Sequence, residues 1–368
     1  MSDADPLETG YWIAFNRIPG VGAIKIKRLY DRFGSLALAW QSDPAGLGRA
    51  GLEAKAVESV LAARPRLDPE RELAALARQA VRALTVVDPD YPERLRQIYA
   101  PPAVLYLRGE LLPADELAVA VVGTRRATMY GREAAEALVA ELVANSITIV
   151  SGLARGIDTV SHRAALQAGG RTVAVLGSGL DVIYPYENKR LAEEIAERGA
   201  VVSEYPLGTK PDAANFPPRN RIISGLSLGT VVVEAGEDSG ALITADFALE
   251  QNREVLAVPG PIFARTSRGT NRLIQQGAKL VLSAQDVLDE LNLASAPQQM
   301  EMRELLGAVA ANPTEVTLLG ILTREPLHID EVCRQAVLPA AEVLSALAML
   351  ELKGAVRQLG GMHYVLAR

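Results

Sequence analysis

The chain has 368 residues, of which 49% are hydrophobic and 22% charged, and its formal net charge is −6. This length predicts two or three domains, and the composition is that of an ordinary globular protein. The single cysteine excludes disulfides within the chain, and the three histidines are scattered without metal-ligand spacing, so neither a metal nor another cofactor is expected. The polar, acidic start, and the lack of an uncharged run of roughly 18–20 residues, predict a cytoplasmic protein with no membrane partner.

Residues 1–88 have the pattern of an all-α domain that ends in a charged stretch. Within it, IPGVGAIKIKRLYDRFG at 18–34 places a tight glycine turn before a helix that carries Lys25, Lys27 and Arg28. The segment resembles a helix-hairpin-helix element of a SAM-like domain, in which loop amides and nearby bases meet a phosphate backbone without reading its sequence. An ordinary helix connection with exposed lysines explains it equally well.

Residues 89–292 alternate short Val-, Ile- and Ala-rich runs with amphipathic segments, which predicts a parallel α/β sheet. The expected strands are 117–122, 147–151, 171–176, 200–203, 229–234, 254–258 and 279–282. The expected helices between them are 129–144, 156–168, 187–198, 240–252 and 283–292.

Residues 293–313 are expected to be a linker, and 314–368 a C-terminal domain of three helices and a hairpin, with Gly354 capping the third helix. This is the pattern of a winged helix. Its third helix, the one that would enter a DNA groove, has two glutamates and only Lys353 as a base, so its attraction for phosphate is poor. The pattern favours a protein-contact or structural role, and duplex DNA binding stays open.

Glycine-rich turns that carry Ser, Thr or Arg follow several of the predicted strands. Such turns deliver backbone N–H groups and helix N-termini to one sheet edge, where anions bind. After the first of these strands, Gly123 is followed by Arg125 and Arg126 rather than by the Gly-x-Gly-x-x-Gly of dinucleotide-binding proteins. Arginines at this position suit a phosphate in an open groove, and a bound NAD or FAD is not expected.

The turn VSGLARGID at 150–158 contributes Ser151, Gly152 and Arg155 to this edge. Arg155 is expected either to bind an anion or to cap a neighbouring loop. Asp158 is expected to be a structural residue near the start of the following helix, where its charge is favoured by the helix dipole.

The segment NFPPRNRIISG at 215–225 discriminates most between functions. Two prolines fix the backbone before a helix, presenting Phe216 at its start and Arg219, Asn220 and Arg221 in its first turn. An aromatic ring beside arginines is the arrangement that stacks an unpaired base while holding its phosphate. The alternative is that Phe216 belongs to the core.

The segment VEAGEDSGALIT at 233–244 supplies a further anion site at a helix N-terminus, formed by Ser239, Gly240 and Thr244. Three acids in the same turn, Glu234, Glu237 and Asp238, would repel a phosphate unless they were turned away or protonated. The sequence offers no physical reason for their presence.

Together the motifs VVGTRRAT, SGLARGID, GSGLDVIYP, NFPPRNRIISGLS, EAGEDSGALITADFAL and GTNRLIQQGAKLV resemble the DNA-processing protein A family (DprA, also called Smf), in its full three-domain form. The resemblance implies an extended Rossmann-like fold that binds single-stranded DNA and is not an enzyme. It also implies that the protein protects incoming DNA in natural transformation, loads a RecA-type recombinase and helps to displace single-strand-binding protein.

The resemblance also assigns residues. It places DNA contacts on Arg125, Phe216, Arg219 and Asn220, with Thr124 where the family has serine. Two lysines that many members carry are replaced here by Tyr186 and Ala213, and Lys189 and Lys210 are the nearby candidates to substitute for them, with Lys189 favoured. A homodimer contact is implied over 269–282, including Asn271 and Leu280.

An enzyme is the rival hypothesis, because the turn at 234–246 also resembles that of nucleoside-monophosphate phosphoribohydrolases. Those carry Pro-Gly-Gly-x-Gly-Thr followed by paired glutamates. Here the leading proline and the double glycine are missing, and Asp246 is the one acid on the nearby helix. The acid/base pair that such a reaction needs is therefore incomplete, and DNA binding is favoured.

Overall fold

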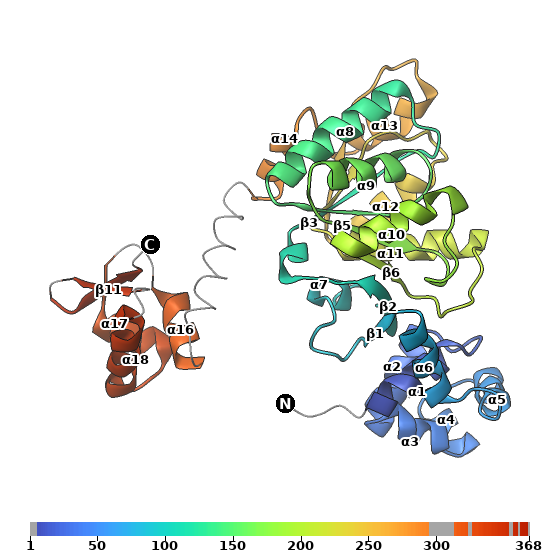
Figure 1. Cartoon of the computed structure of the whole chain (residues 1–368), viewed down its shortest axis with the longest axis horizontal. Helices are drawn as coiled ribbons and strands as arrows, with labels where there is room; N and C mark the ends of the chain where they lie inside the picture. Colours follow the sequence, from blue (N-terminus) through green and yellow to red (C-terminus); the bar gives the residue numbers. More distant parts are fainter. Residues whose placement is uncertain (1–5, 294–312, 323–325, 353–355, 360, 367–368) are drawn as a thin grey trace. The chain divides into compact units, whose positions relative to one another are not determined.

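The computed structural model describes residues 6–293, 313–322, 326–352, 356–359 and 361–366 (Figure 1). The chain divides into two compact units, Met1–Leu293 and Ala294–Arg368. Almost all of the expected linker, and the expected cap at Gly354, lie outside the described residues.

The first unit begins with helices, as the sequence predicts. Their bounds are α1 (Pro6–Asn16), α2 (Ala23–Phe33), α3 (Leu36–Gln41), α4 (Pro44–Arg49), α5 (Ala54–Ala63) and α6 (Pro69–Arg78). Short polar side chains fix where several of them start: the Ser35 hydroxyl accepts a hydrogen bond from the Ala37 amide at α3, and Asp43 and Asp68 cap α4 and α6. The core of this part is aromatic, with Phe15 and Trp40 packed edge to face at a centroid distance of 5.1 Å.

The two lysines on α2, just after the glycine turn, have partners within the chain. Lys25 lies 3.7 Å from Glu53 and donates to the Gly20 carbonyl, and Lys27 pairs with Asp31. Both lysines therefore have local partners.

The rest of the first unit is built on a nine-stranded sheet in the order β1-β2-β6-β5-β4-β3-β7-β8-β9. The strands are β1 (Arg82–Thr85), β2 (Val104–Gly109), β3 (Ala118–Val122), β4 (Thr148–Ser151), β5 (Thr172–Leu176), β6 (Ala200–Ser203), β7 (Gly229–Val232), β8 (Glu254–Ala257) and β9 (Lys279–Leu280). From β6 to β9 every neighbouring pair is parallel, which confirms the predicted α/β sheet.

Two strands of this sheet were not predicted. β1 falls in the charged stretch assigned to the helical part, and the prediction of helix there is wrong for 82–85. β2 joins β1 to β6, antiparallel to both. The first four residues of β2, 104–107, are all buried, because both faces of this strand are covered. A continuous apolar run of this length has no period that separates strand from buried helix.

Helices follow the strands and cover both faces of the sheet. They are α7 (Glu93–Arg96), α8 (Met129–Ala144), α9 (Ile157–Gln167), α10 (Lys189–Arg198), α11 (Phe216–Gly225), α12 (Gly240–Glu250), α13 (Arg268–Gln275) and α14 (Ala284–Glu290). α8 packs against α9 and α9 against α10, whereas α11 packs against α12 (Figure 1). The chain runs from β3 to β6 in one direction and from β7 to β9 in the other, so right-handed crossovers place the two groups of helices on opposite faces.

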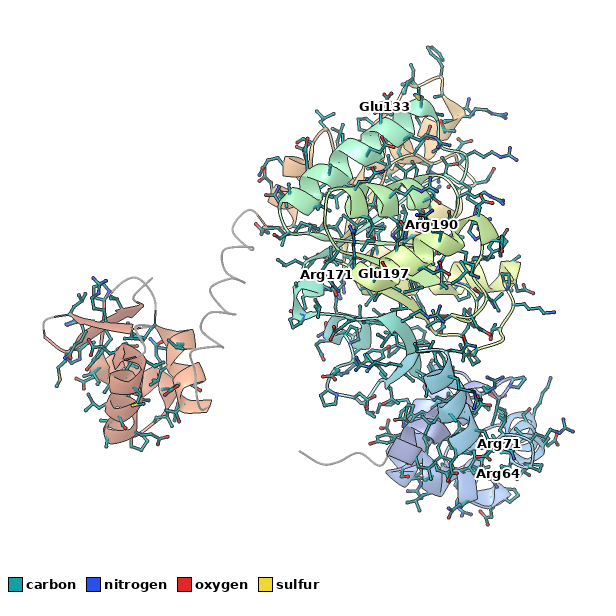
Figure 2. All side chains as sticks on the ribbon, in the orientation of Figure 1. Arg64, Arg71, Glu133, Arg171, Arg190 and Glu197 are labelled. Carbon is teal, nitrogen blue, oxygen red and sulfur yellow. The ribbon has the colours of Figure 1, made fainter. Side chains whose placement is uncertain are left out.

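Because strands β3 to β9 are parallel, their carboxyl ends all lie along one side of the sheet, called here the carboxyl-end edge, and their amino ends lie along the opposite edge. Figure 2 marks the carboxyl-end edge with Glu133 and Arg190, near the starts of α8 and α10. It marks the opposite edge with Arg171, just before β5, and Glu197, near the end of α10. The turns that follow the parallel strands, β3 to β9, open on the first of these edges, whereas the turn after the antiparallel β2 opens on the second.

The second unit has its own buried core and the elements of a winged helix. They are α16 (Pro313–Ile321), β10 (Leu327–His328), α17 (Ile329–Ala336), α18 (Ala340–Leu352), β11 (Val356–Leu359) and β12 (His363–Leu366). The hairpin of β11 and β12 is the predicted one, and β10 adds a third strand to it. Across the described parts of the chain, no single helix is long and apolar enough to cross a membrane. The one pair of helices that reaches the required length and composition when combined is α17 with α18, and the two are bent by 109° relative to each other.

Candidate nucleic-acid interface

The turns after β3 and β7 meet at the carboxyl-end edge of the sheet, where the strand order reverses. The Thr124 amide donates to the Glu234 carbonyl over 2.7 Å and joins the two turns. Gly123 lies below this bond, and a Cβ on it would be 2.5 Å from Ile157 Cγ1. Ligands of open α/β sheets bind at such a reversal point, so this edge is the candidate site.

Gly156 fixes the position of the first arginine turn. Its φ is +77°, and a Cβ on it would lie 2.2 Å from the Thr124 carbonyl oxygen and 2.7 Å from the Arg125 carbonyl carbon. Only glycine therefore lets the β4–α9 turn pass against the backbone of Thr124 and Arg125. The close approach holds Arg125 at the edge without using its side chain.

Phe216 begins α11 and lies over the end of β5. A Cβ on Gly177 would be 2.9 Å from the Phe216 ring, so the ring rests directly on the backbone there. Tyr184 lies beside it, with 5.7 Å between ring centroids and 41° between planes. Phe216 is half-buried and Tyr184 is 41% exposed. The pair thus forms an aromatic surface that is anchored on one side and accessible on the other.

Sequence reasoning missed Tyr184 as a member of the site. Its only signal was an aromatic residue before Pro185, at the end of a glycine-rich turn. Nothing in that pattern shows that the turn folds back onto α11, because the contact joins segments more than 30 residues apart.

Arg125 and Arg126 are both exposed at this edge. The Arg125 guanidinium lies over the Phe216 ring, with 5.4 Å from Cζ to the ring centroid. This cation–π contact uses none of the guanidinium's N–H groups as hydrogen-bond donors to an acceptor oxygen, so they stay available to an anion. In the described part of the chain, neither arginine forms an ion pair with an acid.

Arg219 lies elsewhere than expected. It is 4% exposed, and its Nη1 donates to the carbonyls of Gly152, over 2.7 Å, and of Val175. These bonds tie α11 to the ends of β4 and β5, next to the Phe216 ring. Burial lowers the pKa of Arg219 to about 10, which leaves it charged at neutral pH. As placed, Arg219 is buried beside the Phe216 ring, and its Nη1 donors are used by backbone carbonyls of its own chain rather than by a phosphate.

The residues that lead out of β4 are also structural. The Ser151 hydroxyl is fully buried and donates to the Val121 carbonyl. Gly152 is buried and closely surrounded. A Cβ there would lie 2.7 Å from Arg219 Nη2 and 2.8 Å from Asp158 Oδ2, so a larger residue would not fit. Burial raises the pKa of Asp158 to about 6, against the opposing effect of Arg219, and its carboxylate accepts from the Ala154 amide. These side chains hold the turn rather than face a ligand.

Two of the expected phosphate ligands are paired with carboxylates. Arg155 makes a bidentate pair with Glu187, with two distances of 2.7 Å, and both side chains are 56% exposed. Of the two alternatives for Arg155, the structure shows the loop contact. Arg221 pairs with Glu204 at 3.0 and 2.7 Å, and these side chains are only 13% and 17% exposed. Arg221 is therefore part of the packing between α11 and the end of β6.

The start of α12 is only partly open. Ser239 caps the helix by accepting from the Ala241 amide, and the Gly240 carbonyl accepts from Asn220 Nδ2 over 3.2 Å. Asn220 thereby links α11 to α12. Thr244 is 1% exposed, so its side chain does not reach the surface where it was expected.

The acids of the same turn now have an explanation. Glu234 is 2% exposed, and its carboxylate accepts from both the amide and the hydroxyl of Thr128, each over 2.9 Å. It satisfies the start of α8, where a negative charge is favoured. Glu237 lies 3.8 Å from Arg268, and Asp238 is exposed. Only these last two present their charge to the solvent.

Lys189 lies at the start of α10 and lines a cavity of about 260 Å³ together with Arg108 and Asp181. None of the other predicted DNA contacts lines this cavity. Lys210 and Tyr186 are exposed, the latter at 79%. Lys189 thus lines a cavity that includes neither Arg125 nor Phe216.

The expected dimer residues lie at the far end of the sheet. Leu280 is in β9, the edge strand, and is 38% exposed, and the neighbouring Leu282 is 79% exposed. Asn271 instead makes two hydrogen bonds to the backbone of Gly260, at 3.1 and 3.0 Å. Leu280 is available to a partner, whereas Asn271 holds a loop of its own chain.

Comparisons with known proteins agree with this architecture. The family model of DNA recombination-mediator protein A matches residues 82–292, and that of the DprA winged helix domain matches residues 303–362. Protein Smf of Synechocystis is 38% identical over 97% of this chain and 98% of its own. DNA processing protein DprA of Bacillus subtilis is 47% identical over 60% of this chain and 75% of its own.

Two solved structures are similar as well. DNA processing protein A from Streptococcus pneumoniae matches with a TM-score of 0.68 and 38% identity, over 78% of this chain and 98% of that one. DNA processing protein A from Helicobacter pylori, described with its single-stranded DNA binding mode, matches with a TM-score of 0.52 and 31% identity, over 57% of this chain and 95% of that one. The matches in sequence and in fold together show that this chain belongs to the DNA recombination-mediator protein A (DprA/Smf) family.

Proposed function

We propose that the protein binds single-stranded DNA along the carboxyl-end edge of its sheet, and that Arg125 and Phe216 form the centre of the site. The observation that carries the proposal is the exposed guanidinium of Arg125 held 5.4 Å from a half-buried aromatic ring. The ring supplies a stacking surface for an unpaired base, and the guanidinium supplies donors for the adjacent phosphate. Neither contact depends on the identity of the base, which suits a protein that coats DNA of any sequence.

The proposal modifies the set of DNA contacts drawn from the sequence. Arg125, Arg126, Phe216, Ser239 and Gly240 are proposed to contact the strand, since they lie at the accessible edge. The residues that are buried or bonded within the chain are proposed to position these contacts. They are Ser151, Gly152, Arg219, Asn220, Arg221 and Thr244. Arg155 is proposed to join the site only when its pair with Glu187 opens.

The proposal for the wider role rests on the resemblance to the family. We infer that the protein protects incoming single strands in the cytoplasm during natural transformation, hands them to a RecA-type recombinase and helps to displace single-strand-binding protein. A strand held by its backbone and by one or two stacked bases leaves most Watson–Crick edges free, as a recombinase that must search for homology requires.

A homodimer through the β9 edge is also proposed. The edge strand β9 offers unpaired backbone groups, and Leu280 in it and Leu282 just beyond it offer exposed apolar surface to a second copy. Leu280→Arg is expected to give a monomer in light scattering, whereas a wild-type protein that is already monomeric contradicts the proposed interface.

The experiment that tests the function is binding to oligo-deoxythymidine at low ionic strength, followed by fluorescence anisotropy. Saturable binding that weakens with salt is expected. Incubation with nucleoside monophosphates tests the rival hydrolase, and release of free base would overturn the non-catalytic proposal. A protein that ignores the oligonucleotide altogether would overturn the DNA-binding proposal.

A further inference from the structure

A second aromatic residue projects from the edge that carries Arg125. Phe263 is 90% exposed and Ile262 is 75% exposed, and both lie in the turn between β8 and α13. Large apolar side chains in such a turn are costly to leave in water. Neither side chain has a place in the site described above.

This turn is anchored rather than loose. Asn271 holds Gly260 by two hydrogen bonds, and the Tyr130 hydroxyl donates to the Pro259 carbonyl over 2.6 Å. The Gly269 amide donates to the Ala235 carbonyl over 2.9 Å. The base of the turn is thereby fixed to the first turn of α8 on one side and, through the start of α13, to the β7–α12 turn on the other. Phe263 is held out by a rigid support.

The turn also lies in line with the proposed site. β8 is separated from β3 by β7 alone, and β5, under Phe216, lies on the other side of β3 with β4 between them. Four strand spacings therefore separate the ends of β5 and β8, which is about 19 Å. Arg125 and Arg126 fall between the two aromatic residues along this edge. A flexible polymer that follows the edge meets Phe216, the two arginines and Phe263 in that order.

Charges in this part of the edge suit a polyanion. Arg126 and Arg265 are exposed and, among the described residues, have no acidic partner. Arg268 lies 3.8 Å from Glu237, in a pair with both side chains more than half exposed. Asp238 in the β7–α12 turn and Glu133 on α8 are further exposed acids, and Arg132 on α8 is a further exposed base. The aromatic ring is thus accompanied by unpaired guanidinium groups, the combination that binds a base and its phosphates.

We propose that Phe263 is a second stacking platform for the single strand, engaged by a base several nucleotides away from the one at Phe216, with Arg126 and Arg265 on the intervening phosphates. This rests on the proposed DNA binding and deepens it. It makes the affinity depend on oligonucleotide length: a short strand reaches one aromatic residue, and a longer one reaches both.

The test is a series of oligo-deoxythymidines of increasing length, titrated against wild type, Phe263→Ala and Phe216→Ala. Tyr99→Ala is the matched control, since Tyr99 is 85% exposed and lies outside this edge. Phe263→Ala is expected to bind the shortest oligonucleotides as wild type does and to lose about 5- to 150-fold on the longest, the range for one stacked base. Phe216→Ala is expected to weaken binding at every length.

A position-specific measurement complements the titration. Photocrosslinking of long oligonucleotides with 5-iodo-deoxyuridine at one site is expected to label the peptide of Phe216 from one position and that of Phe263 from another, several nucleotides away. Phe263→Ala with wild-type affinity at every length, in a protein that binds DNA, would overturn the second platform and leave the first intact. A wild-type protein that binds no oligonucleotide would overturn both.

Discussion

The guanidinium of Arg125 lies over the ring of Phe216, although the two residues are 91 positions apart in sequence and start on different elements. Two close backbone approaches and one side chain create the contact: Gly156 lets its turn press against Arg125, Gly177 lets the ring rest on the end of β5, and the Arg219 guanidinium ties α11 to the same strand. The geometry is thus set by close backbone approach, and the Arg125 side chain stays free at its rim.

Alanine substitutions of Arg125 and Phe216 are predicted to weaken DNA binding in different ways. Arg125→Ala is expected to weaken oligo-deoxythymidine binding and to reduce the slope of log K against log salt by about 0.7, because one phosphate contact is lost. Phe216→Ala is expected to cost about 1–3 kcal/mol of binding free energy without changing that slope. Anisotropy titrations over a range of salt concentrations measure both.

The control for that pair is Arg71→Ala, which removes an arginine that is 89% exposed on α6, outside the site (Figure 2). It is expected to match wild type in affinity and slope. An unchanged slope in Arg125→Ala would remove this residue from the phosphate path.

Glu187→Gln is predicted to tighten binding at low salt. Glu187 holds Arg155 in a bidentate pair in the free protein and competes with a phosphate for it. Loss of the carboxylate charge releases the guanidinium and removes a repulsion for the strand. The measurement is a double-mutant cycle with Arg155→Ala, in which the gain from Glu187→Gln is expected to disappear. A gain that persists without Arg155 shows that only the general charge has changed.

Arg219→Ala is predicted to lower the free energy of unfolding by about 3–5 kcal/mol, because it leaves two buried carbonyls without a donor and Asp158 without its neighbouring cation. Arg219→Lys is expected to recover only part of this, since one ammonium group does not reproduce the planar fork. Urea unfolding followed by circular dichroism measures the change.

Arg126→Ala serves as its comparison, since Arg126 is exposed and is expected to shift stability by no more than about 0.5 kcal/mol. Wild-type stability in Arg219→Ala would mean that its hydrogen bonds to the strand ends contribute nothing net.

Asp158 is predicted to make the protein less stable as the pH rises through its titration. Burial raises its pKa from 3.8 to about 6, so between these values the folded state keeps a proton that the unfolded chain has released. The contribution of this group to the free energy of unfolding is therefore greatest below pH about 4 and is lost as the pH rises through about 6. Urea midpoints at several pH values are expected to show a steeper fall for wild type than for Asp158→Asn. Parallel curves for the two proteins would contradict the raised pKa.

Removal of the second unit, from Ala294 onward, is predicted to leave single-strand affinity within a few-fold. The first unit has its own core and carries every residue of the proposed site. Residues 314–368 hold one more acid than base, so they add little attraction for phosphate. The shortened and full chains are to be compared on one oligo-deoxythymidine at one salt concentration. A hundredfold loss would place a main contact in the second unit.

Much of the architecture could be predicted from local pattern. The seven predicted strands and the five helices between them all form, because each apolar run or amphipathic segment is locally consistent with its element. The winged-helix pattern at the C-terminus was predicted in the same way. β1 and β2 were missed because their pairing joins a charged stretch to a short apolar run, and only the partner strand decides that both become extended.

The amino-acid sequence by itself determined which turns reach the carboxyl-end edge and which chemical groups they carry: arginines, glycines and aromatic residues. It could not determine which arginine is free, since Arg125, Arg155, Arg219 and Arg221 all stand in similar glycine- or proline-rich segments. The tertiary structure decided this by supplying partners from distant segments, namely Glu187, Glu204 and the carbonyls at the ends of β4 and β5. A charged group is available to a ligand only where folding has brought it no partner, and that depends on contacts between elements far apart in the chain.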